Sequence, residues 1–191
     1  TGLNKDIKIA LGKLVEPPHN IDYLHGIYLI CTKYFKFSDN EFIDSLSKIK
    51  KPKGRFNVIK LSNESILIDY TYNAVCDQTI IEGTKFVIDL SKKQNKKLVV
   101  VIPNMVENGI SADEQHKNIS KYLNSSDLEK LYIVGDNLKY YKKYLKIKYK
   151  STNFADELKI KLSKNTIYYI KATRRYHGPE LVEKIKHGYT K

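Results

Sequence analysis

Cysteine and long apolar runs are both scarce in this chain of 191 residues. The two cysteines, Cys31 and Cys76, cannot build a disulfide framework, and their spacing does not fit a metal site. The longest apolar runs, such as Leu98 to Ile102, have the length of a strand and fall far short of the roughly 18 residues that span a bilayer. No basic stretch followed by an apolar one marks a signal peptide. We therefore expect a reduced, cytoplasmic protein without a membrane segment.

Several catalytic motifs are also missing from the sequence. Gly83-Thr84-Lys85 lacks the upstream glycine of a phosphate-binding GxxxxGK[ST] loop, and neither a Gly-x-Ser-x-Gly elbow nor a His-x-x-x-His metal pair occurs. No complete catalytic site is therefore predicted within these residues. The chain begins at Thr1 rather than at a methionine, so we expect a fragment or a processed product whose chemistry needs further chain.

Arginine is rare although the net charge is +13. The only arginines are Arg55, Arg174 and Arg175, and all the other basic residues are lysines and histidines spread along the chain. A nucleic-acid footprint gathers its charge on one element or face, so this pattern favours solvated lysines over a specific nucleic-acid site. A nonenzymatic module that binds nucleic acid or another polyanion stays open as an alternative. The 41% hydrophobic and 29% charged residues are typical of a soluble globular protein.

Helical periodicity dominates residues 1–52. Apolar residues recur at steps of three and four between His19 and Phe35, which predicts an amphipathic helix. Ser38, with Glu41 three residues later, predicts the capped start of a second helix that continues to Ile49. The Lys51-Pro52-Lys53-Gly54 segment ends this helical unit.

Strands and helices alternate through residues 53–191. The predicted elements are a hairpin of strands 58–61 and 66–68, helix 77–92, strand 98–102, helix 112–123, strand 131–134, helix 137–145, strand 147–149, helix 154–163, strand 167–170 and helix 179–187. This alternation predicts an α/β fold, a Rossmann-like open and mostly parallel sheet with helices on both faces, preceded by a short helical segment.

Polar residues follow four of the predicted strands, where ligands of open α/β sheets bind. Asp69, Asn104, Asp136 and Lys171 stand at or just beyond these strand ends. We expect Asp136 to cap the following helix, whereas Asp69 precedes its helix by about eight residues and is poorly explained by capping. Asp69, Asn104 and Lys171 should meet at one edge of the sheet.

Five segments resemble the C-terminal part of the Mur ligase family in their order and spacing. They are His19-Asn20, Lys53-Gly54-Arg55, Ile68 to Ala74, Met105 to Gly109 followed by Glu114-x-His116, and Ile170 to Arg174. These ligases use ATP to join amino acids or peptides to UDP-muramoyl precursors of the cell wall, and the branch that adds D-alanyl-D-alanine is the most similar. Departures at Val75-Cys76 and Pro103-Asn104 leave a ligase with another acceptor open.

The resemblance implies a role for each part of the chain. Residues 1–52 would be the helical end of a central ATPase domain, and residues 53–191 the C-terminal Rossmann-like ligase domain. A substrate carboxylate would be activated as an acyl phosphate and then attacked by an amine. The implied ATP-binding residues are Asn20, Arg55, Asp69, Tyr72 and Asn73, and the implied substrate-binding residues are Asn104, Glu107, His116, Lys171 and Arg174.

The same resemblance implies the ligands and partners. ATP and Mg²⁺ would be required, with the Mg²⁺ ligands outside this chain. The partners would be a UDP-muramoyl-type precursor, an amino acid or dipeptide, and the rest of the ligase chain. No membrane partner is expected, and these residues alone should be inactive because they lack the phosphate-binding loop.

Overall fold

A computed structural model describes residues 21–49, 52–74, 76–105 and 109–188. The chain divides into two compact units, Thr1–Pro52 and Lys53–Lys191.

The first unit contains helices α2 (Ile21–Lys33) and α3 (Asp39–Lys48). The capping box predicted from Ser38 is confirmed: the Glu41 backbone N–H donates to Ser38 Oγ at 3.3 Å, and the Ser38 N–H donates to Glu41 Oε2 at 2.8 Å. The bond from Ser38 stabilises the carboxylate and lowers the pKa of Glu41. Phe42 and Leu46 of α3 are buried, and Tyr28 of α2 packs edge-on against Phe42.

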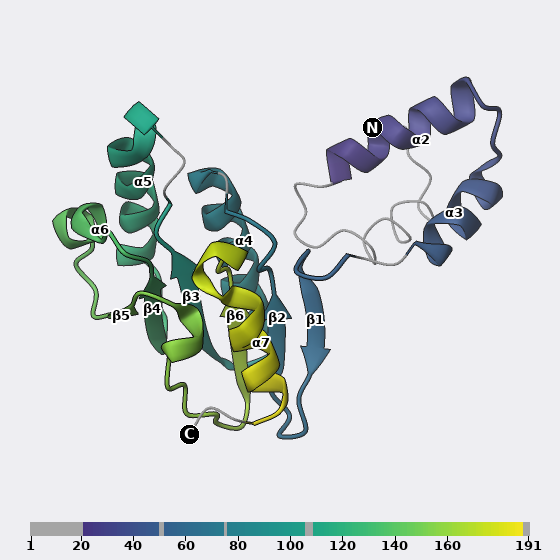
Figure 1. The fold of residues 1–191 in the computed structure, drawn as a ribbon. Coiled ribbons are helices and arrows are strands. Elements are labelled where there is room, and N and C mark those ends of the chain that lie inside the picture. The colour runs from purple at the N-terminus through teal and green to yellow at the C-terminus, as the bar shows by residue number, and fades with distance from the viewer. Residues whose placement is uncertain (1–20, 50–51, 75, 106–108, 189–191) are drawn as a thin grey trace. The chain divides into compact units, whose positions relative to one another are not determined.

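The second unit is built on one six-stranded sheet with the order β1-β2-β6-β3-β4-β5 (Figure 1). Strand β1 is antiparallel to β2, as expected of a hairpin, and every other neighbouring pair is parallel. The predicted fold class is confirmed. The strands are β1 (Asn57–Lys60), β2 (Ile66–Asp69), β3 (Lys97–Pro103), β4 (Lys130–Val134), β5 (Lys150–Thr152) and β6 (Thr166–Ile170).

Helices cover both faces of this sheet. Helices α4 (Asp77–Lys93), α5 (Ala112–Asn124) and α6 (Lys139–Tyr144) contribute to one hydrophobic core, and α7 (Gly178–Lys186) contributes to the other and lies in front of the sheet in Figure 1. Side chains of a strand alternate between its faces, so Val100 and Ile102 enter the first core while Val99 and Val101 enter the second. This double burial explains the unbroken apolar run of β3. Among the residues described, no helix is long and apolar enough to cross a membrane.

The predicted helix over residues 154–163 is wrong. Only Ala155–Glu157 forms a 3₁₀ turn, and residues 158–163 belong to neither helix nor strand. Leu158 and Ile160 are buried on the α7 side, separated by exposed Lys159. Because buried and exposed side chains alternate with a period of two, the segment packs on the sheet as an extended chain and not as a helix.

The strand predicted at residues 147–149 lies three residues later, at β5. Ile147 and Tyr149 instead pack against the core formed by α4, α5 and α6. Pairing with β4 begins only at Lys150, opposite Tyr132. The apolar residues Ile147 and Tyr149 therefore belong to the loop that leads into β5, and the strand itself begins after them.

Candidate functional site

The carboxyl ends of the parallel strands meet at one edge, as the sequence predicts. Asp69 of β2 and Val101 of β3 both lie opposite Ile170 of β6. The Lys171 N–H then donates to the Val101 carbonyl at 2.8 Å, and the Asn104 N–H donates to the Val134 carbonyl at 2.6 Å. Asp69, Asn104 and Lys171 therefore leave the sheet on the same side.

Two arginines from distant parts of this unit meet at one tyrosine ring. The Arg55 guanidinium carbon lies 3.7 Å from the centroid of the Tyr72 ring, and that of Arg174 lies 5.1 Å from the same centroid. Both distances are within the range of a cation–π contact. Tyr72 remains 39% exposed, so the group is open to solvent. We call Arg55, Tyr72 and Arg174 the cationic cluster.

Gly54 allows Arg55 to reach this cluster. The Gly54 carbonyl accepts a hydrogen bond from the Tyr72 N–H at 3.1 Å, which joins the segment before β1 to the segment after β2. Gly54 has a φ of +74°, and a Cβ at this position would lie 2.9 Å from the Tyr72 nitrogen. Only glycine suits both the left-handed backbone and this close approach.

Lys171 lies near enough to this cluster for the charge of Arg55 to affect it. Its side chain is buried, with 1% of the residue exposed. Its Nζ donates to the Asn73 carbonyl at 2.5 Å and lies 3.5 Å from the centroid of the Tyr70 ring. Burial, followed by the charge of Arg55, lowers the pKa of Lys171 to about 7. The predicted substrate contact is thus an internal amine in this structure.

Asp69 shapes the chain that leads to Tyr72. Its Oδ1 accepts hydrogen bonds from the Thr71 N–H at 3.1 Å and the Thr71 hydroxyl at 2.7 Å. With 8% of the residue exposed, Asp69 offers little surface to a ligand. These bonds form a local turn of the type that aspartate commonly stabilises. The turn sets the direction of the segment that carries Tyr72 and Asn73.

Asn104 and His116 form a second group, at the end of β3. His116 Nδ1 lies 2.6 Å from the Ala112 carbonyl, so it donates there, and Nε2 then accepts from the Met105 N–H at 3.4 Å. Asn104 Oδ1 lies 3.1 Å from the same Nε2. Burial lowers the pKa of His116 despite the opposing effect of its bond to Ala112. Within the described ranges, no hydrogen bond, ion pair or ring contact joins this group to the cationic cluster.

Asp136 does not cap the following helix, so that prediction is wrong. Its Oδ1 accepts a hydrogen bond from the Tyr176 hydroxyl at 3.2 Å. The side chain at the start of α6 is that of Asn137, which accepts from the Lys139 N–H at 3.3 Å. Asp136 therefore ties the end of β4 to the segment after β6.

Tyr70 and Tyr176 are site residues that the sequence reasoning did not single out. Both are largely buried and interleave with the polar residues that follow their strands. Tyrosine is frequent at apolar positions throughout this chain, so composition offered no signal for these two. Asn20 and Glu107, which were predicted to bind ATP and substrate, lie outside the described residues. In the part of the chain that is described, no group of three His, Cys, Asp or Glu residues is placed to hold a metal ion.

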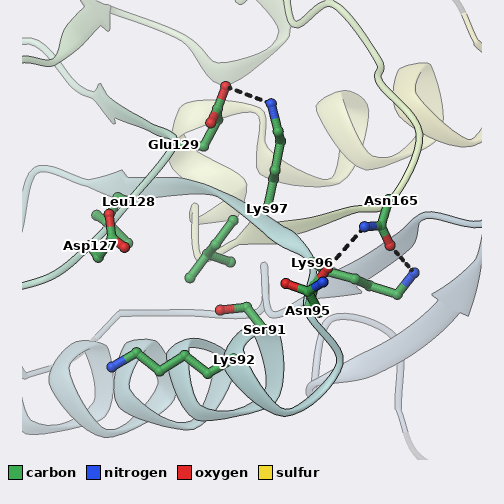
Figure 2. Close-up of a pocket in the computed structure, with 10 residues that line it drawn as sticks. Ser91, Lys92, Asn95, Lys96, Lys97, Asp127, Leu128, Glu129 and Asn165 are labelled. Carbon is green, nitrogen blue, oxygen red and sulfur yellow. Dashed lines mark hydrogen bonds and ion pairs between the residues drawn. The ribbon is translucent and has the colours of Figure 1, made fainter.

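A pocket of about 610 Å³ lies at the opposite, amino-terminal edge of the sheet (Figure 2). Lys97 forms an ion pair with Glu129 there, and Lys96 donates to Asn165 Oδ1 at 3.1 Å. These contacts join neighbouring segments of the chain, and they already give Lys96 and Lys97 partners within the protein. Open α/β sheets bind ligands at the carboxyl edge, so we place the candidate site at the cationic cluster despite the size of this pocket.

Comparisons with known proteins support the fold. No protein-family profile matches the chain, and no curated protein matches its sequence. The structure of MurF ligase from Thermotoga maritima in complex with ADP is similar, with a TM-score of 0.62 and 21% identity, over 83% of this chain and 36% of that one.

Two further solved structures are similar in the same way. MurF from Acinetobacter baumannii has a TM-score of 0.63 and 19% identity, over 82% of this chain and 35% of its own. The UDP-N-acetylmuramate-alanine ligase MurC from Thermotoga maritima has a TM-score of 0.59 and 15% identity, over 91% of this chain and 39% of its own. This chain thus spans little more than about a third of the length of these neighbours.

Proposed function

We propose that this chain is the C-terminal part of an ATP-dependent amide ligase of the Mur type. Residues 53–191 would receive the nucleotide and the incoming amino substrate, and residues 1–52 would be the helical end of a central ATPase domain. The observation that carries this proposal is the cationic cluster at the carboxyl edge of the sheet. The ordered sequence motifs support it, as does the structural likeness to a MurF ligase crystallised with ADP.

The charge of the cluster suits an anionic ligand. Guanidinium groups bind carboxylate and phosphate oxygens through paired hydrogen bonds. Among the described residues, neither Arg55 nor Arg174 forms an ion pair with a carboxylate. Both guanidiniums instead lie against the half-exposed Tyr72 ring. As far as the described residues go, no carboxylate competes with an anion for these guanidinium donors.

The roles proposed for the individual residues come from the resemblance to the Mur ligases. Arg55, Tyr72 and Asn73 would contact the nucleotide, and Arg174 would hold a carboxylate of the amino substrate. Because Arg55 and Arg174 share one ring, the phosphate and the amino substrate would approach each other at this point. Phosphoryl transfer to a substrate carboxylate, followed by displacement of phosphate by an amine, would develop negative charge where these cations lie.

Two of the remaining predicted residues would hold neighbouring backbone segments in place. Asp69 would set the turn that carries Tyr72, and His116 would anchor the Met105 segment to α5. Asn104, Asn20 and Glu107 stay proposed ligand contacts. The ligands of Mg²⁺ and the UDP-muramoyl-type acceptor would be supplied by the rest of a longer chain in the cytoplasm, acting in cell-wall precursor synthesis.

Titration with inorganic pyrophosphate tests the cluster directly. We expect the backbone amide resonances of Arg55, Tyr72, Asn73 and Arg174 in the isotope-labelled 191-residue chain to shift at low ionic strength. Amides that line the pocket at the opposite edge, such as Asn95 and Leu128, should not shift. Changes confined to that pocket or to the surface lysines of α6 would contradict the proposed site.

The isolated chain should not hydrolyse ATP or form an amide bond. Its sequence lacks the loop that cradles the phosphates, so the cluster has no bound triphosphate to act on. A coupled assay for ADP release is expected to show no turnover above the rate without protein. Turnover at ordinary enzyme rates, about 1 per second or more, would show that these residues contain a catalytic centre of their own.

Nucleic-acid binding should be weak, independent of sequence and lost by physiological salt. The exposed lysines Lys48, Lys97 and Lys143 already pair with neighbouring carboxylates on separate elements. Binding that depends on scattered charges falls steeply as salt is raised. Fluorescence anisotropy with labelled DNA and RNA at low and physiological salt measures this. A salt-resistant, submicromolar complex would favour the alternative function, a nonenzymatic module for polyanions.

A further inference from the structure

The position of Lys171 is unusual for a residue that contacts substrate. A lysine that binds a ligand through its charge exposes its ammonium, whereas Lys171 is among the largest fully buried side chains of the chain. Its Nζ is already engaged by the Asn73 carbonyl and the face of the Tyr70 ring. Both partners belong to the segment after β2, which also carries Tyr72. Lys171 itself follows β6, so it joins two strand ends.

The surroundings of Nζ come from several elements. Arg55, before β1, opposes the ammonium charge, and the Cys76 thiol, at the start of α4, favours it. Tyr70 provides the ring beneath Nζ. Burial raises the pKa of Tyr70; the charge of Arg55 opposes this shift, and Cys76 and Glu82 add to it. Among the residues described, no carboxylate forms an ion pair with Lys171 Nζ. The Asn73 carbonyl and the Tyr70 ring are therefore the main contacts that hold the charge in place.

We propose that Lys171 is a positioning residue, a clamp that holds the segment 70–74 against the end of β6 and thereby keeps Tyr72 where Arg55 and Arg174 meet. Lys171 would act through Tyr72 and Asn73 and would not touch the ligand. The clamp is a property of the unliganded chain. Only its effect on anion binding rests on the proposed function.

The clamp should weaken as the pH rises through neutrality. With a pKa of about 7, Lys171 is charged below this pH and largely neutral above it. The neutral amine keeps at most an ordinary hydrogen bond to Asn73 and loses its attraction to the Tyr70 ring, because both interactions are strongest for a cation. The segment 70–74 is then expected to loosen.

The effect of Lys171 on global stability should have the opposite sign. Its pKa in the folded chain is below the usual 10.5, so between these values the unfolded chain binds more protons. Folding stability therefore rises with pH across this range, and below pH 7 the buried charge opposes folding. At pH 6, Lys171→Met should leave the unfolding temperature unchanged or raise it while loosening the segment. Replacing a residue that had only a structural role would instead lower the unfolding temperature.

A pH titration followed by NMR tests the clamp in the chain without ligand. We expect the Lys171 side-chain resonances to titrate with a midpoint near pH 7, and the amides of Tyr72, Asn73 and Ala74 to follow the same midpoint. The amide changes should disappear in Lys171→Met. They should persist in Lys150→Met, a matched control that removes an exposed lysine from β5.

Two results would overturn the clamp. One is a Lys171 midpoint near that of an ordinary lysine, and the other is a set of amide changes that survives in Lys171→Met. The pyrophosphate titration, repeated at pH 6 and pH 8, separates this inference from the proposed function. If the clamp titrates but pyrophosphate never binds, the proposed function fails and the clamp stands. If pyrophosphate binds equally well in Lys171→Met and in the unchanged chain at pH 6, the proposed effect of the clamp on anion binding is wrong.

Discussion

Gly83→Ala is expected to destabilise the chain by about 1–3 kcal/mol, the usual cost of overpacking a core. Gly83 lies in the interior of α4, and a Cβ there would come within 2.2 Å of the Tyr169 hydroxyl oxygen. Tyr169 is fully buried in β6, so its ring cannot move outward. This clash exceeds the gain of up to about 1 kcal/mol that alanine normally brings to a helix interior. Urea unfolding of the variant and of the unchanged chain measures the difference.

The sign of this effect should reverse in the Tyr169→Phe background. The Tyr169 hydroxyl has no hydrogen-bond partner among the described residues, and burial raises its pKa well above the usual value. Without that oxygen, the nearest atom to the new Cβ is the ring carbon at 3.3 Å, a tight but tolerable contact. Gly83→Ala should then stabilise the chain through helix propensity alone.

Gly26→Ala serves as the control for this double-mutant cycle. Gly26 also lies inside a helix, α2, but a Cβ there would meet no atom within 4 Å. Alanine should be neutral or stabilising at this position in either background. An equal loss from Gly83→Ala with and without the Tyr169 hydroxyl would show that the clash is not its cause.

Arg174→Ala is expected to weaken pyrophosphate binding by the chain at least about tenfold, which corresponds to ~1.4 kcal/mol. A charge-assisted hydrogen bond to an anion contributes about this much or more. Arg55→Ala should have a similar effect, since both guanidiniums lie on the Tyr72 ring. If they hold one anion together, the double variant should lose less than the sum of the two single losses. NMR titration of each variant provides the affinities.

Arg175→Ala is the matched control. Arg175 adjoins Arg174 and carries the same charge, but its guanidinium carbon lies 5.8 Å from the Tyr176 ring and not at Tyr72. Its loss should change the affinity only slightly, through long-range electrostatics that salt screens. Equal effects of Arg174→Ala and Arg175→Ala would mean that net charge, rather than the cluster, binds the anion.

In a complete ligase, Arg174→Ala shows whether Arg174 holds the amino substrate or ATP. If Arg174 holds the carboxylate of the amino substrate, Arg174→Ala should raise the KM for that substrate about tenfold and change the KM for ATP much less. A loss confined to ATP would assign Arg174 to the nucleotide together with Arg55. Steady-state kinetics with each substrate varied in turn provides this comparison.

The sequence by itself determined the architecture of the second unit. The alternation of apolar strand runs with helical periodicity identified the sheet, because each pattern follows from the geometry of its own element. It also placed Asp69, Asn104 and Lys171 at one edge, since parallel strands all end on the same side. The helix predicted over residues 154–163 is wrong for a related reason: Leu158 and Ile160 recur with a period of two, which is the spacing of an extended segment and not of a helix.

Only the tertiary structure decided which of the polar residues at the strand ends are exposed and which are buried. Lys171, Asp69 and His116 were each predicted as ligand contacts, yet all three are buried and bonded to neighbouring backbone or side-chain groups. Arg55 and Arg174, assigned to different ligands from the sequence, lie on one ring. Local patterns specify where a residue leaves its strand, but its exposure and partners depend on strand register and on segments that are distant along the chain.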